Sequence, residues 1–147
     1  MKKAFTMIEL IFVIVILGIL AAVVIPRLAV ARDDAKISKF SQNLSMTITD
    51  CISFYISQGK YDKDISKMTN VDVVNKKDYT AELAMNDVSC VKIVLYNEND
   101  TKNGINKGSL EVIPINKDNV ICKKLHLIPS IKNHLQAKRY IINNTIN

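Results

Sequence analysis

An uninterrupted apolar run near the N-terminus constrains this chain more than any other feature. Residues 10–25 read LIFVIVILGILAAVVI, sixteen residues without a polar side chain. The wider stretch from Phe5 to Ile25 is interrupted only by Thr6 and Glu9. A helix needs about 20 apolar residues to cross a bilayer. We therefore expect a membrane-spanning helix that includes one carboxylate near its start.

The carboxylate of Glu9 is the unusual part of this segment. A charged side chain costs roughly 2.5–3.5 kcal/mol at the centre of a bilayer and less near its surface. A cleaved secretory signal would use the basic start at Lys2 and Lys3 and a cut after Ala31. A permanent anchor would retain Met1. Neither interpretation explains Glu9, which is either a tolerated interfacial residue or part of a functional site.

The string KKAFTMIELIFVIVILGILAAVVIPRL, residues 2–28, resembles the N-terminal signature of type IV pilins and of the related type II secretion pseudopilins. In that family a prepilin peptidase cuts before the Phe of an FT-hydrophobic-IE motif and methylates the new N-terminal amine. The resemblance implies a cut between Ala4 and Phe5, with Phe5 as the methylated residue. The family usually has Gly before the cut, where this chain has Ala4.

The same resemblance implies roles for two further residues. Glu9 would pair with the N-terminal amine of a neighbouring subunit as the helices pack into a filament. Such a pair compensates a buried charge and fixes the register between subunits. Pro26 falls where the family often kinks its long helix, because a helix-interior Pro lacks an N–H donor.

A second helical pattern follows the apolar run. One face is marked by apolar residues three or four positions apart, namely Ile37, Phe40, Leu44, Ile48, Cys51 and Tyr55. Gly59 is the expected end of the helix. We therefore divide the chain into a leader (1–4), a membrane or filament-core helix (5–27), its amphipathic continuation (28–59) and an α+β head (60–147).

The head shows mixed secondary-structure signals. We expect short helices at 64–68 and 79–85, strands at 91–96, 110–115 and 120–127, and a helix at 130–140. The segment 97–108 is rich in turn-forming residues and predicts a long hairpin loop. The predicted fold is α+β and pilin-like, with one long N-terminal helix packed against a small antiparallel sheet of about three strands.

Three cysteines, Cys51, Cys90 and Cys122, allow three pairings. Cys51 lies on the apolar helix face and fits a buried free thiol. We favour a disulfide between Cys90 and Cys122, which would add roughly 3–4 kcal/mol to the stability of a small domain. The alternative is three reduced thiols.

We expect neither catalysis nor a metal. His126 and His134 are the only histidines, and no carboxylate lies near them in the sequence. The loop 97–108 contains Glu98 and Asp100, but it lacks the spacing of a calcium loop and includes two lysines. We predict no cofactor, no metal site and no enzymatic activity.

Charge is unevenly distributed along the chain. Residues 101–147 carry eight Lys or Arg against two acidic residues, whereas residues 33–100 carry eight basic and eleven acidic residues. The basic excess predicts a solvated surface. It also fits an acidic face on the next subunit, or DNA, which we do not expect as a partner.

The resemblance implies a structural subunit of a type IV pilus-like filament, with a type II secretion pseudopilin favoured over a surface pilin or a competence (DNA-uptake) pilin. The implied partners are copies of itself or related pilins, the prepilin peptidase, an inner-membrane assembly platform with its ATPase, and the bilayer before assembly. The implied location is the bacterial inner membrane, with the head in the periplasm, followed by a periplasmic or cell-surface filament. The rival from another class is a secreted binding domain released after Ala31.

Overall fold

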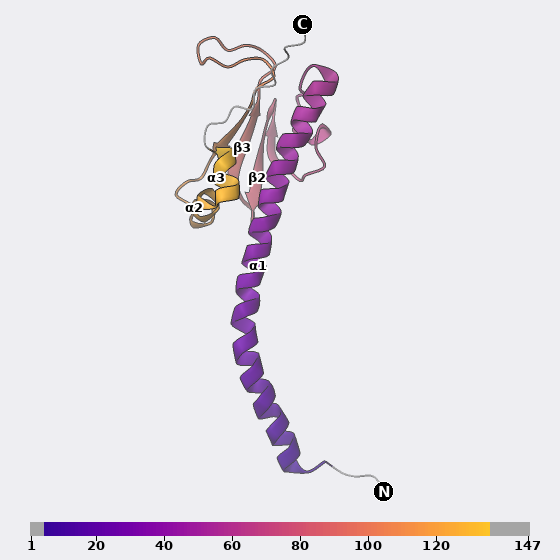
Figure 1. The fold of residues 1–147 in the computed structure, drawn as a ribbon, viewed down its shortest axis with the longest axis vertical. Helices are drawn as coiled ribbons and strands as arrows, with labels where there is room; N and C mark the ends of the chain where they lie inside the picture. The colour runs from indigo at the N-terminus through magenta and orange to yellow at the C-terminus, as the bar shows by residue number, and fades with distance from the viewer. Residues whose placement is uncertain (1–4, 136–147) are drawn as a thin grey trace. The chain divides into compact units, whose positions relative to one another are not determined.

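The computed structural model describes residues 5–135, and for residues 26, 29 and 30 it describes the backbone alone. Helix α1 is followed by a short 3-10 helix, four strands and two short helices. Their bounds are α1 Met7–Gln58, η1 Ile65–Lys67, β1 Val74–Lys77, β2 Thr80–Met85, β3 Val88–Leu95, β4 Leu110–Pro114, α2 Val120–Leu127 and α3 Pro129–Leu135. The fold is α+β, as the sequence predicts (Figure 1).

Two compact units make up the chain, residues 1–36 and residues 37–147. The first unit contains the apolar part of α1. Its span Met7–Ile25 has a mean hydropathy of 3.2, and none of it is buried within the chain. This span is long and apolar enough to cross a membrane. Its side chains therefore need cover from outside the chain, either lipid or other helices.

The second unit contains the rest of α1, which carries the predicted apolar stripe. Phe40, Leu44, Ile48, Cys51 and Tyr55 on this stripe are all buried and share one core with the sheet. The predicted helix face is therefore confirmed.

The end of α1 lies where the sequence places it. Gly59 has a φ of 71°, and its N–H donates to the carbonyl of Tyr55 at 2.7 Å. This left-handed conformation is one that Gly adopts at little cost, so it ends the helix.

The sheet is an antiparallel meander in the order β1-β2-β3-β4. Strands β3 and β4 pair in continuous register, from Leu95 opposite Leu110 to Val91 opposite Pro114. Alternate residues along β3 are buried, including Val91, Ile93 and Leu95. One face of the sheet thus packs against the buried stripe of α1.

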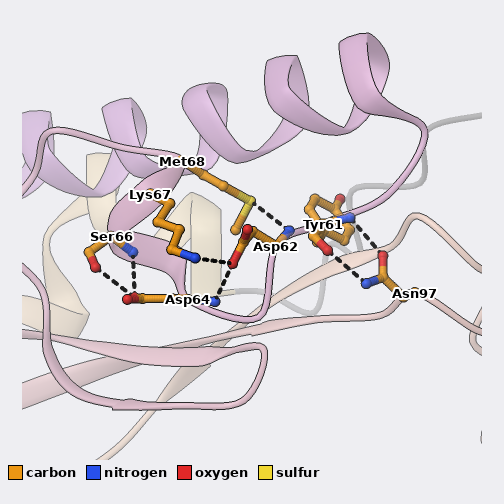
Figure 2. A network of polar contacts seen from close by, with 7 residues as sticks. All are labelled: Tyr61, Asp62, Asp64, Ser66, Lys67, Met68 and Asn97. Atoms are coloured by element: carbon orange, nitrogen blue, oxygen red, sulfur yellow. Dashed lines mark hydrogen bonds and ion pairs between the residues drawn. The ribbon is translucent and has the colours of Figure 1, made fainter.

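The segment after α1 is fixed by polar contacts (Figure 2). The Tyr61 N–H donates to Asn97 Oδ1 at 2.7 Å, and Asn97 Nδ2 donates to the Tyr61 carbonyl at 2.9 Å. Asp64 caps η1, because its Oδ1 accepts from the Ser66 N–H at 3.0 Å. The two bonds between Tyr61 and Asn97 tie the segment after α1 to the connection between β3 and β4.

Two predicted elements of the head are wrong. Residues 79–85 were expected to be helical, but Thr80–Met85 forms strand β2. Its side chains Ala81 and Leu83 alternate into the core, and it pairs with β3 along its length. The local sequence AELAM favours a helix, and long-range strand pairing overrides that preference.

The second error is the strand expected at 120–127, which is helix α2. Asn119 caps this helix, with its Oδ1 accepting from the Ile121 N–H at 2.9 Å. Cys122 and Leu125 are buried three residues apart, which is helical spacing.

The sheet has four strands rather than about three, because β1 and β2 replace the strand that was expected at 120–127. The hairpin loop between β3 and β4 and the short helix near residue 65 are confirmed. Helix α3 confirms the start of the helix expected at 130–140, and residues 136–140 lie outside the described residues.

The predicted disulfide is present in the structure. Cys90 on β3 and Cys122 on α2 are bonded, with their Cα atoms 5.0 Å apart. Cys51 is a buried free cysteine. The disulfide joins α2 to the sheet, and its two cysteines are 32 residues apart in the sequence.

Candidate functional site

The candidate site is the first turn of α1, where Glu9 lies. Helix α1 begins at Met7, so Thr6 is its N-cap and Glu9 is the third helical residue. The carbonyl of Thr6 accepts from the Leu10 N–H at 3.3 Å, as expected of an N-cap residue.

Glu9 and Thr6 form a reciprocal pair of contacts. The Thr6 N–H donates to Glu9 Oε2 at 2.8 Å, and the Thr6 hydroxyl donates to the same oxygen at 2.6 Å. In return, the Glu9 N–H donates to Thr6 Oγ1 at 3.4 Å. This arrangement is a capping box, in which Ser or Thr at the N-cap and Glu three residues later satisfy each other's backbone donors.

The capping box changes how the charge of Glu9 is accommodated. Its carboxylate lies in the first turn of α1, where the helix dipole favours a negative charge. An N-cap contributes about 1 kcal/mol, which is less than the roughly 2.5–3.5 kcal/mol that a charge costs deep in a bilayer. The cap therefore offsets only part of the cost of placing Glu9 in lipid.

The sequence reasoning missed this contact. The signal was present as Thr6-Met7-Ile8-Glu9, which has the Thr-x-x-Glu spacing of a capping box. Thr6 is thus a partner of Glu9 within the same chain, in addition to the partner expected in a neighbouring subunit.

The sequence predicts the processing site at Ala4 and Phe5. Phe5 precedes the N-cap and is 82% exposed. Ala4 and the rest of the leader 1–4 lie outside the described residues. Position 26 falls within α1, and the kink expected at Pro26 stays a prediction.

The two histidines make contacts between elements of the head. His126 Nε2 lies 2.7 Å from the carbonyl oxygen of Cys90, so this nitrogen carries the proton and donates. His134 Nε2 lies 3.3 Å from Ser45 Oγ. Both rings thus join a C-terminal helix to β3 or α1.

In the loop between β3 and β4, side-chain oxygen atoms accept hydrogen bonds from backbone N–H groups of the same loop. Asp100 Oδ1 accepts from the backbone N–H groups of Lys102 and Asn103 at 3.1 and 3.3 Å. Asn99 Oδ1 accepts from the Lys107 N–H at 2.7 Å. Within residues 5–135, no group of three or more His, Cys, Asp or Glu side chains is placed to hold a metal ion.

Comparison with known proteins gives one match. The family model described as the prokaryotic N-terminal methylation motif matches residues 1–25. Searches of curated proteins and of solved structures found no match.

The match defines the class of N-terminus that the chain carries. Residues 1–25 carry the prepilin signature of type IV pilins and pseudopilins, and the α+β fold is pilin-like. The motif implies processing by prepilin peptidase and assembly with pilins into filaments. Its family consists of structural subunits. Together with the exposed apolar helix, the motif supports a membrane-anchored precursor that is processed as a prepilin.

Proposed function

We propose that this chain is a structural subunit of a type IV pilus-like filament, and specifically a type II secretion pseudopilin. The observation that carries the proposal is the methylation motif at residues 1–25, together with an apolar helix span, Met7–Ile25, that no described residue covers. Lipid covers these apolar side chains before assembly, and the helices of neighbouring subunits cover them in the filament.

The proposed processing begins with a cut between Ala4 and Phe5. Methylation of the new Phe5 amine follows, as the motif family implies. The cut brings a cationic N-terminus to within four residues of Glu9 along the chain. In the low-dielectric filament core, this amine and the Glu9 carboxylate of a neighbouring subunit form a charge pair.

The charge pair compensates the part of the cost of the Glu9 charge that the capping box leaves. The cap offsets about 1 kcal/mol of the cost of Glu9, and an ammonium group in the same apolar surroundings compensates the remaining charge. The paired state therefore favours one register between neighbouring helices. The apolar segments pack in a heterologous array that does not close, which yields a filament.

The remaining steps of the proposed assembly are those that the resemblance to type IV pilins implies. The precursor lies in the bacterial inner membrane with its head, residues 60–147, in the periplasm. An assembly platform and its ATPase extrude the subunits, and a kink at Pro26 fits the helix to the filament. The leader, helix and head boundaries at residues 4, 27 and 59 belong to this proposal.

Among filament types we favour the secretion pseudopilin because the head is compact. The second candidate is a surface pilin for adhesion, motility or DNA uptake. The two differ in the phenotype of a deletion in the native bacterium. A pseudopilin predicts that secreted proteins accumulate in the periplasm while motility and DNA uptake stay normal. Normal secretion combined with lost motility or DNA uptake would contradict the pseudopilin assignment.

A further inference from the structure

An open groove of about 270 Å³ lies where α2 and α3 meet the end of β4. Its lining combines apolar and cationic side chains, namely Pro114, Lys117, Lys123, His126, Leu127 and Leu135. Leu127 is 68% exposed although it is a large apolar residue. An exposed apolar surface with a charged rim is typical of a protein-binding site.

The groove is held in place by bonds to the sheet. The disulfide fixes Cys122 of α2 to Cys90 of β3, and His126 of the same helix donates to the Cys90 carbonyl at 2.7 Å. Helix α2 therefore has two links to one residue of β3. A surface that is already ordered loses less entropy when a partner binds.

The charge of this region is not neutralised within the described chain. Lys117 and Lys123 are exposed and form no ion pair with any residue between 5 and 135. Residues 101–135 carry six lysines against Glu111 and Asp118, a net charge of +4. The groove thus fits an acidic partner that also has a small apolar surface.

A matching surface exists on helix α1 of the same chain. Asp33 and Asp34 are the only two acidic residues that are adjacent in the sequence. Both are exposed, and neither forms an ion pair with another described residue. Ala31 and Ala35 lie one helical turn apart and are also exposed. Ala31 is three residues before Asp34, so it lies on the same side of the helix as Asp34. Small side chains four residues apart let another surface approach the helix closely.

We propose that the groove of one subunit binds the Asp33–Asp34 stretch of α1 in a neighbouring copy of this chain. The inference rests on the proposed filament. The doublet lies eight residues beyond Ile25, so it emerges from the apolar core when neighbouring helices pack together. Lys117 and Lys123 pair with Asp33 and Asp34, while Leu127 packs against Ala31 beside Asp34. The contact joins two different surfaces and therefore continues along a helical array.

The test is charge reversal in the full-length chain, expressed in the native bacterium, with filament yield measured by immunoblotting and electron microscopy. The pair of changes K117E and K123E replaces attraction with repulsion. Exposed ion pairs are individually weak, and we expect the loss of both to reduce the yield of filaments about tenfold, which corresponds to about 1.4 kcal/mol. Lys124→Glu is the matched control, because Lys124 lies on α2 but does not line the groove; it should leave the yield unchanged.

The reciprocal changes make the test specific. D33K with D34K should lose filaments to a similar extent, and the combination of all four changes should restore them. Restored assembly also shows that K117E and K123E do not act by unfolding the head. Unchanged yield with K117E and K123E, or failure of the four-fold combination to restore it, would overturn the contact.

Two other outcomes are distinguishable. Loss of DNA binding by K117E and K123E with normal filaments would contradict a subunit contact and assign the groove to a polyanion. A wild-type chain that never assembles would overturn the proposed function and this contact with it. Wild-type assembly that is insensitive to charge reversal would overturn the contact alone.

Discussion

The backbone N–H of Thr6 donates a hydrogen bond to the carboxylate of Glu9 at 2.8 Å, and the Thr6 hydroxyl donates to the same oxygen at 2.6 Å. Glu9 therefore caps its own helix in the single chain. The filament proposal gives the same carboxylate a second task, pairing with the Phe5 amine of a neighbour. The two tasks differ in what they require, because capping needs an acceptor and pairing needs a negative charge.

Glu9→Gln separates these tasks. Gln serves in a capping box as Glu does, so α1 should still begin at Met7 and insert into the membrane. Gln cannot form a charge pair with the N-terminal amine, so we expect membrane-inserted subunits that do not assemble. Membrane fractionation followed by electron microscopy of filaments measures both properties. Normal filaments with Glu9→Gln would show that the charge is not needed.

The matched change is Thr6→Ala, which removes the N-cap and keeps the charge. It should cost about 1 kcal/mol of helix stability while filaments still form. If Thr6→Ala also abolishes assembly, then assembly requires the cap as well as the charge.

Gly108→Ala should destabilise the head. An added Cβ would lie 2.8 Å from the Cζ of Tyr55, and Gly108 has a φ of 84°. The ring of Tyr55 has little room to move, because it packs against Tyr61 with ring centroids 4.7 Å apart. We expect the free energy of unfolding to fall by about 1–3 kcal/mol from the contact with Tyr55 and by roughly a further 1–2 kcal/mol from the left-handed conformation. Urea unfolding of the purified chain measures this loss.

Gly104→Ala is the control for backbone conformation alone. Gly104 has a φ of 61°, and no atom lies within 4 Å of the position of an added Cβ. The left-handed conformation by itself costs about 1–2 kcal/mol. Equal losses at the two glycines would show that the contact with Tyr55 contributes nothing.

Removing the disulfide should destabilise the head more than removing the free thiol. The double change C90A with C122A opens a link across 32 residues, and chain-entropy arithmetic gives a loss of roughly 3–4 kcal/mol. Cys51→Ala keeps the disulfide and should cost about 1 kcal/mol. Urea unfolding without reductant compares the two variants. A smaller loss for C90A with C122A than for Cys51→Ala would contradict the structural role of the bond.

Alkaline pH should destabilise the head through Cys51. Burial, and then the nearby charge of Asp50, raises the pKa of this thiol from 9.0 to about 12. Because the pKa is higher in the folded state, the contribution of the neutral thiol is fully present below pH 9 and is lost as the pH rises towards 12. Burial also raises the pKa of Tyr61, with the same sign of effect.

Unfolding midpoints in urea between pH 7 and 11 measure this effect, and Cys51→Ala should make the decline less steep. Tyr61 remains in that variant, so part of the decline should persist. A decline of the same steepness in wild type and variant would show that Cys51 does not contribute.

The long helix and its buried stripe could be predicted because both depend on local patterns. Phe40, Leu44 and Ile48 recur at helical spacing, and Gly59 ends the helix through its own backbone freedom. The pairing of Cys90 with Cys122 was favoured because Cys51 belonged to that stripe. The helix, its apolar face and its end can be predicted without knowing which segments pack together.

Strand β2 and helix α2 could not be predicted for the opposite reason. Ala81 and Leu83 lie in a segment of helix-forming residues that becomes a strand by pairing with β3. Helix α2 depends on the cap at Asn119 and on the burial of Cys122 and Leu125 against the sheet. The four-stranded sheet is thus decided by contacts between segments that are distant in sequence.

At the candidate site, the sequence indicated the importance of Glu9 and missed its nearest partner. A carboxylate within a membrane span suggests a partner in another subunit. Thr6 lies only three residues away, however, and its N–H already binds the Glu9 carboxylate. The capping box was visible in the spacing and is the part of the site that sequence reasoning should have found.

The central claim is that this chain is processed as a prepilin. The most direct test is the mass and N-terminal sequence of the protein recovered from its native bacterial membrane. The account predicts a chain that begins at Phe5 and carries one added methyl group on its N-terminal amine. A chain that begins at Arg32, or one that retains Met1, would contradict it.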